Sequence, residues 1–160
     1  IRKIGFMGAS EKKGYVSLRR KGFLEGMKEA SLKFPASMEL KTPQSAIWNE
    51  DLCSQVAEYV LKNKPEAVIC SSDPFAMKLL AAISSCGLKC PEDILVTGYG
   101  NLEYCVFSNP PLTTVAQPFR RIGYEAASLI LSYIKNGTDY RQNILLPIEF
   151  IVRKSSCKTI

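Results

Sequence analysis

The fold is decided by one stretch near the middle of the chain, Pro65-Glu66-Ala67-Val68-Ile69-Cys70-Ser71-Ser72-Asp73-Pro74. Its four apolar residues, 67–70, form a short run that is typical of a buried strand in a parallel sheet. Asp73 is a favourable helix N-cap, and Pro74 suits the first helical position, where its missing N–H costs nothing. The apolar helix expected over 75–86 ends at Gly87, a natural C′ residue. A buried strand that leads at once into a helix indicates an α/β fold.

The same alternation of strand and helix extends from this stretch in both directions. Apolar runs at 3–8 and 94–99 predict two further buried strands, and weaker signals predict extended segments at 37–41, 112–115 and 144–152. Apolar residues at helical spacing predict helices over 15–32, 49–62 and 119–134, the last capped by Asn136-Gly137. We therefore expect an α/β domain of three layers, α/β/α, with a mostly parallel sheet.

The composition is that of a globular protein and excludes several kinds of site. The chain has 160 residues, 46% of them hydrophobic and 22% charged, and a net charge of +6. Because it has no His, a Ser-His-Asp triad, a Cys-His dyad and a His-ligated metal site are excluded within this chain. Its six cysteines include no pair at CxxC spacing. We therefore expect no metal site, no cofactor, and free thiols in a reducing compartment rather than disulfides.

The chain also lacks the signals of a membrane or secreted protein. No apolar run approaches the roughly 20 residues of a membrane span, and the start at Ile1 resembles a strand rather than a signal peptide. We expect a cytoplasmic location and no membrane partner. Because the sequence begins without Met, we interpret it as part of a longer protein.

Small and polar residues follow three of the expected strands. They are Gly8-Ala9-Ser10, Ser71-Ser72-Asp73 and Gly98-Tyr99-Gly100-Asn101. Ligands of open α/β sheets bind beyond the carboxyl ends of the strands, so these residues predict a small-molecule site there. No GxGxxG motif and no Walker-type loop is present, so the sequence gives no support for binding a nucleotide phosphate.

Six short motifs, in order along nearly the whole chain, resemble one family. They are Arg19-x-x-Gly22-Phe23; Pro65 to Asp73 followed by Ala76; Gly87-x-x-x-Pro91-Glu92-Asp93-Ile94-x-Val96-x-Gly98-Tyr99; Pro110-Pro111-Leu112-Thr113-Thr114-Val115-x-Gln117-Pro118; Gly123-x-x-Ala126; and Leu146-Pro147 with Val152-Arg153-x-Ser155. Together they resemble the effector-binding core of LacI/GalR-type bacterial transcription repressors.

This resemblance implies a domain organisation and a set of partners. Residues 1–117 and 147–160 would form the C-terminal lobe of a periplasmic-binding-protein-like core, and 118–146 would cross into an N-terminal lobe. A small effector, a sugar or related metabolite, would bind between the lobes. Operator DNA would be bound only through a helix-turn-helix absent from this chain, and the protein would be a homodimer and not an enzyme.

The resemblance also assigns candidate ligand-binding residues. Arg19 matches an Arg that binds effector oxygens, although a surface Arg on an amphipathic helix is the alternative. Trp48 aligns with an aromatic that stacks on the effector, with partial core packing as the alternative. Ser72 occupies a position often held by a ligand-contacting Asn. Asp73 would cap its helix and border the cleft, and Phe119 would face the pocket or act as a hydrophobic staple.

The chain departs from the family pattern at Gly100. The family usually has an Asp here that accepts hydrogen bonds from the effector, and Asn101 is the nearest residue that could substitute through its amide. Losing an acceptor of this kind costs about 1.5–3 kcal/mol when the bond is to a charged group. The resemblance therefore predicts either an unusual effector or a site that has lost sugar binding.

Two other functions and two packing questions stay open at this point. The same architecture serves solute-binding proteins of transport systems, and an α/β enzyme would have to use Asp73 or Glu103, the acids near strand ends. The expected helix 75–86 is apolar on more than one face, which fits either burial within three layers or a second subunit. The expected helix 119–134 would either cover this sheet or exchange with another chain.

Overall fold

The computed structural model describes residues 1–10, 14–49, 51–137 and 143–158, which build one six-stranded sheet. In sheet order the strands are β2 (Glu39–Thr42), β1 (Ile4–Ala9), β3 (Ala67–Cys70), β4 (Leu95–Gly100), β5 (Thr113–Ala116) and β6 (Glu149–Ile151). All neighbouring pairs are parallel except the last, in which β6 runs antiparallel to β5. The prediction of a mostly parallel α/β sheet is confirmed.

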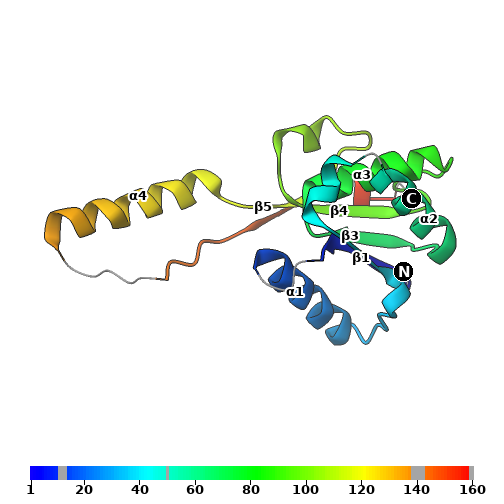
Figure 1. Ribbon diagram of the computed structural model, residues 1–160, viewed down its shortest axis with the longest axis horizontal. Coiled ribbons are helices and arrows are strands. Elements are labelled where there is room, and N and C mark those ends of the chain that lie inside the picture. Colours follow the sequence, from blue (N-terminus) through cyan, green and yellow to red (C-terminus); the bar gives the residue numbers. More distant parts are fainter. Residues whose placement is uncertain (11–13, 50, 138–142, 159–160) are drawn as a thin grey trace.

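Helices cover both faces of the sheet. Helix α1 (Tyr15–Glu29) lies on one face, and α2 (Asp51–Asn63) and α3 (Asp73–Ser85) lie on the other (Figure 1). Because side chains alternate along a strand, Phe6 points toward α1, where its ring centroid is 5.1 Å from that of Phe23, while Met7 joins the core under α2 and α3. The three layers that the sequence predicts are therefore present.

The main core lies between the sheet and helices α2 and α3. Helix α3 contacts both β4 and α2, and it buries Phe75, Ala76, Leu79, Leu80, Ala82 and Ile83. Burial within the three layers accounts for most of its apolar surface. From α2, Tyr59 donates a 2.9 Å hydrogen bond to the Met38 carbonyl. Its hydroxyl occupies the space beside Gly5, where a Cβ would lie 2.1 Å away.

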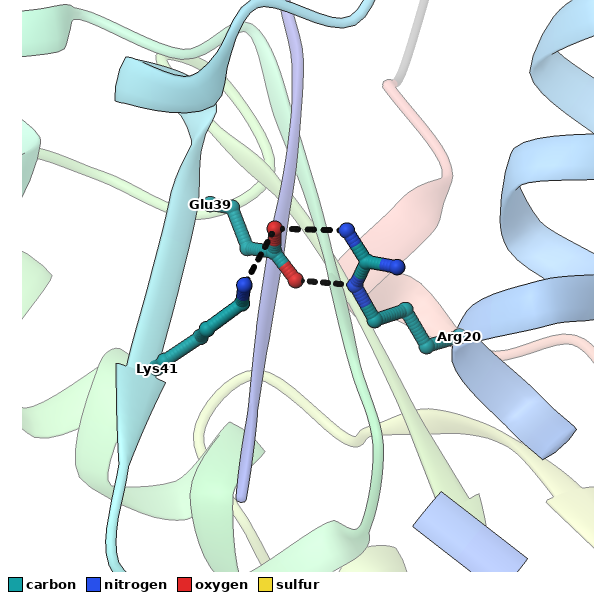
Figure 2. A network of polar contacts seen from close by, with 3 residues as sticks. All are labelled: Arg20, Glu39 and Lys41. Carbon is teal, nitrogen blue, oxygen red and sulfur yellow. Dashed lines mark hydrogen bonds and ion pairs between the residues drawn. The ribbon is translucent and has the colours of Figure 1, made fainter. Parts of the chain in front are cut away.

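An ion-pair network ties α1 to the edge strand β2. The Arg20 guanidinium donates two hydrogen bonds to the Glu39 carboxylate, and Lys41 Nζ lies 3.3 Å from the same carboxylate (Figure 2). The Glu39 side chain is 7% exposed, so two cations compensate a mostly buried charge. The Arg20 hydrogen bonds, more than the added positive charges, hold the pKa of Glu39 below its ordinary value.

Glycines end two helices as the sequence predicts, but the start of α3 differs from the prediction. Gly87 (φ 71°) follows α3, and Gly137 (φ 63°) follows helix α4 (Phe119–Asn136), both in the left-handed region. The prediction that Asp73 is the N-cap of α3 is wrong. Ser72 stands at the N-cap with an extended backbone, and Asp73 is the first helical residue. Its carboxylate bonds to other strand ends instead, as described below.

Helix α4 extends away from the sheet. The chain leaves through β5, forms α4 and returns through residues 143–148 into β6 (Figure 1). We call residues 117–137 and 143–148 the arm. No residue of α4 is buried, and the apolar side chains Ile122, Ile130 and Ile134 are exposed. The expectation that this helix could cover the sheet of its own chain is therefore wrong.

All six cysteines are free, as predicted. Cys70 and Cys105 are buried, Cys157 is exposed, and the other three are half-buried. In the parts of the chain that the structure describes, no helix combines the length and apolarity that crossing a membrane would require.

Candidate functional site

A groove of about 450 Å³ opens at the carboxyl ends of the parallel strands. We call it the strand-end groove; it is lined by Tyr15, Arg19, Gln44, Ser72, Pro74, Tyr99, Gly100, Leu102, Gln117 and Phe119. These residues come from the first two turns of α1, the start of α3, the end of β4 and the segment after it, the junction between β5 and α4, and the 3₁₀ helix η2 (Gln44–Trp48). The groove lies at the edge of the sheet where open α/β folds place ligands, and where the sequence predicts a site.

Two other cavities differ from this groove in place and chemistry. One, of about 720 Å³, lies within the arm between α4 and residues 143–148 and is lined mostly by aliphatic side chains. Another, of about 520 Å³, lies between α1 and the sheet and is lined by Phe6, Phe23 and Phe150 among others. The first is formed by the arm alone. The second shares Arg19 and Tyr99 with the strand-end groove and includes Ser71 and Thr97, but most of its lining is apolar. The strand-end groove, with its larger share of polar side chains, is the candidate site.

Arg19 holds the central position in the groove. Its guanidinium lies between two tyrosine rings, with Cζ 3.7 Å from the ring centroid of Tyr99 and 4.6 Å from that of Tyr15. Its Nη1 donates a 2.7 Å hydrogen bond to the Ser71 carbonyl, at the end of β3. The two rings and the carbonyl fix the planar fork in one orientation beside the groove. Partial burial lowers the pKa of Arg19 from its ordinary value, with the two tyrosines acting in the opposite direction.

Asp73 lies directly beneath the groove and joins three strand-end segments. Its fully buried carboxylate accepts hydrogen bonds from the Thr114 hydroxyl (2.6 Å) on β5 and from the Leu102 backbone N–H (2.9 Å) after β4. Burial, followed by the hydrogen bond with Asp73, raises the pKa of the Cys105 thiol to about 12. The Asp73 side chain thus connects β5 and the segment after β4 to the start of α3.

Two glycines make room for this carboxylate. A Cβ at Gly98 would lie 2.3 Å from Asp73 Oδ1, and one at Gly100 would lie 3.1 Å from Oδ2. Gly100 also has a φ of 136°, which residues with a side chain rarely adopt. The departure from the family pattern at Gly100 therefore has a local structural reason in this chain: backbone conformation and Asp73 both oppose a side chain there.

The remaining candidate residues fall into three groups. Ser72 and Phe119 line the groove together with Arg19, and Phe119 is 53% exposed. Asn101 is not among the lining residues, and its amide oxygen accepts a 2.8 Å hydrogen bond from Arg153 Nη2. Trp48 ends η2, but its side chain lies outside the described residues. The binding roles of these residues stay predictions.

Sequence reasoning did not assign a ligand-contact role to several residues that line the groove. Tyr15 and Tyr99 contact the Arg19 guanidinium, and Gln44 and Gln117 line the walls. Tyr99 and Gln117 stand within the quoted motifs, at the ends of expected strands, which is the signal that could have identified them. Tyr15 and Gln44 carry no comparable signal. In the described ranges, no group of three His, Cys, Asp or Glu residues could hold a metal ion.

Comparisons with known proteins agree on one family. The model of the periplasmic binding protein-like domain matches residues 1–156. The HTH-type transcriptional repressor PurR of Aliivibrio salmonicida is 32% identical over 158 residues, and that of Photobacterium profundum is 30% identical over 154; each match covers 96% of this chain and 45% of the relative. The chain thus spans about half the length of these relatives.

A solved structure gives the same picture. A structure of the lac repressor dimer bound to operator and the anti-inducer ONPF is 25% identical and superposes with a TM-score of 0.85, covering 98% of this chain and 53% of that one.

Proposed function

Because the chain belongs to the periplasmic binding protein-like domain family, in the form carried by LacI/GalR-type regulators, we propose that it is the effector-binding part of a transcription regulator. A small effector, a sugar or related metabolite, binds in the strand-end groove. The observation that carries this proposal is the position of Arg19, whose fixed guanidinium lies in the groove formed by α1, α3, α4, β4 and η2.

We propose further that the chain contributes to two lobes. Residues 1–117 and 147–160 form one lobe, and 118–146 belong to a second lobe. The exposed apolar face of α4 supports this division, because an amphipathic helix needs a surface on which to bury its apolar stripe, and this sheet does not supply one. The effector then binds between the lobes, with Phe119 and Gln117 at the crossing point.

The hydrogen bonds of Asp73 offer a route from the groove to the arm. Ser72 and Gly100 line the groove and adjoin Asp73, and Asp73 accepts a hydrogen bond from Thr114 on β5, the strand that leads into the arm. A ligand that draws the two lobes together changes the direction in which the arm leaves the sheet. This is a coupling between two sites through a two-state element, as allosteric repressors require.

Partners and location complete the proposal. The protein acts as a homodimer and binds operator DNA through a separate helix-turn-helix. The PurR relatives are named HTH-type repressors, and one similar structure is a lac repressor dimer bound to operator. We assign it to the cytoplasm, with support from its six free thiols. Its similar proteins are named as repressors, which favours a regulator over the alternative of a solute-binding protein for transport, and over an enzyme.

A ligand screen tests the proposal. The full-length protein is heated with sugars, sugar phosphates and purines, and the screen is repeated with Arg19→Ala. A ligand present at 100 times its Kd adds about 2.7 kcal/mol to the free energy of unfolding, which a thermal shift detects. Lys21→Ala, on the same helix but not among the lining residues, is the matched control.

The result supports the proposal if a ligand stabilises the wild type and Lys21→Ala but not Arg19→Ala, and if it changes operator affinity in a gel-shift assay. Stabilisation that is equal in all three proteins contradicts the assignment of the groove. A ligand that binds through Arg19 yet leaves operator affinity unchanged contradicts the regulatory role.

A further inference from the structure

The strand-end groove has an unbalanced charge. Of its ten lining residues, Arg19 carries the one formal charge, and none is Asp or Glu. The nearest described carboxylate below the groove, that of Asp73, is fully buried and accepts hydrogen bonds from Thr114 and Leu102. The described surface of the groove therefore presents a cation and neutral groups.

Arg19 also differs from its neighbours on α1 in its partners. Arg20 pairs with Glu39, and Lys21 Nζ lies 3.9 Å from Glu25, whereas Arg19 has no carboxylate within 4.0 Å among the described residues. It contacts two aromatic rings and one backbone carbonyl instead. Burial lowers the pKa of Arg19, and the two tyrosines and the charge of Asp73, which is not in contact with it, act in the opposite direction without restoring the ordinary value. A ligand that brings a negative charge offsets the cost of this burial.

Position 100 does not supply a carboxylate that could balance the positive charge of Arg19. A carboxylate there could accept hydroxyl groups of a neutral sugar, but Gly100 combines a φ of 136° with a Cβ position 3.1 Å from Asp73 Oδ2. This lobe therefore offers donors rather than a charged acceptor. The charged donor is the Arg19 fork. The Ser72 hydroxyl oxygen is buried and has no hydrogen-bond partner among the described residues.

We propose that the effector is an anion, a metabolite whose carboxylate or phosphoryl oxygens pair with the guanidinium of Arg19. The inference rests on the proposed function and names the chemical class of the ligand. Arg binds both groups through two parallel N–H···O bonds, and these charge-assisted bonds are about twice as strong as neutral ones. Stacking on Tyr99 and the bond to Ser71 hold the fork in place before the ligand arrives.

The test compares matched neutral and anionic compounds by titration calorimetry on the full-length protein. The pairs are glucose with glucose 6-phosphate, glucose with gluconate, ribose with ribose 5-phosphate, and uracil with orotate; inorganic phosphate and citrate serve as bare anions. In any pair that binds, we expect the anionic member to bind at least about tenfold more tightly. Arg19→Gln should abolish this preference, and Arg19→Lys should keep it with weaker binding, because Lys retains the charge without the fork.

Lys21→Gln is the matched control, since it removes one positive charge from the same helix but lies outside the groove lining. A preference that falls equally in Arg19→Gln and Lys21→Gln reflects net charge and overturns the inference. If the neutral compounds bind as tightly as their matched anions, and their binding depends on Arg19, the inference of an anionic effector is overturned while the proposed function stands. If no compound binds, both fall. If Arg19→Gln does not fold by circular dichroism, the ordering within the wild-type pairs and in Arg19→Lys decides.

Discussion

Replacing Asp73 with Ala tests how strongly the buried carboxylate holds the strand ends together. The change removes a 2.6 Å bond from the Thr114 hydroxyl and a 2.9 Å bond from the Leu102 N–H. Each bond to a charged group contributes about 1.5–3 kcal/mol, and both donors are left without an acceptor beside a cavity. We expect the free energy of unfolding to fall by about 3–5 kcal/mol.

Urea denaturation followed by circular dichroism measures this loss. With an m value of about 2 kcal/mol per molar urea, the midpoint should fall by about 2 M. Asp73→Asn, which keeps one acceptor oxygen, should lose about half as much. Glu103→Gln is the matched control, because Glu103 is an exposed acid of the neighbouring 3₁₀ helix η3 (Glu103–Val106), and it should change stability by less than about 0.5 kcal/mol. A loss below about 1 kcal/mol for Asp73→Ala would refute the role of this carboxylate as a structural anchor.

Three further outcomes follow from the packing, the ion pairs and the thiols. Gly5→Ala should destabilise the protein by about 1–3 kcal/mol in the same denaturation assay, because its Cβ would lie 2.1 Å from the Tyr59 hydroxyl; adding Tyr59→Phe should recover part of the loss, and no recovery would contradict the steric cause. The pKa of Glu39 is lower in the folded protein than in the unfolded chain, where it is about 4.3. Its contribution to the free energy of unfolding is therefore complete above about pH 4.3 and is lost as the pH falls through the folded value. Glu39→Gln should flatten the plot of unfolding free energy against pH below about pH 4.3, and an unchanged slope there would contradict the shift. In thiol labelling at pH 8, the exposed Cys157 should react first. Cys70 should react only on unfolding, because it is buried and burial raises the pKa of its thiol. A fast labelling phase that remains in Cys157→Ser would contradict this order.

Local signals predicted the elements of the sheet well because they are short-range properties of the chain. The apolar run before Asp73 and the glycine after the next helix define a strand and a helix without reference to anything distant. The strand lies at the expected residues, Ala67–Cys70, and the bounds of the helix move by one or two residues to Asp73–Ser85. The β6 strand is shorter than its apolar signal, since only Glu149–Ile151 pair with β5. The rest of 144–152 belongs mostly to the arm. There, an apolar sequence pattern indicates that a surface is buried but does not identify the surface that covers it.

The hydrogen-bond partners of the site residues could not be predicted from the sequence. Asp73 has the right residue type and place for an N-cap, so local rules assign it that role. Its actual partners, Thr114 and Leu102, lie 41 and 29 residues away along the chain and become neighbours only when the sheet forms. The same is true of Asn101, whose amide oxygen is taken by Arg153 from beyond the arm. Long-range contacts thus give both side chains partners that local rules could not predict.

The antiparallel pairing of β5 and β6 gives the molecule a modular design. Ala116 and Glu149 face each other across this pair, although the whole arm separates them along the chain. Antiparallel strands at such a point are close enough for a two-residue turn such as Asn-Gly to join them. In topological terms, the arm is an insertion at the tip of a β-hairpin. Joining Ala116 to Glu149 by such a turn would remove the arm and leave an uninterrupted three-layer domain.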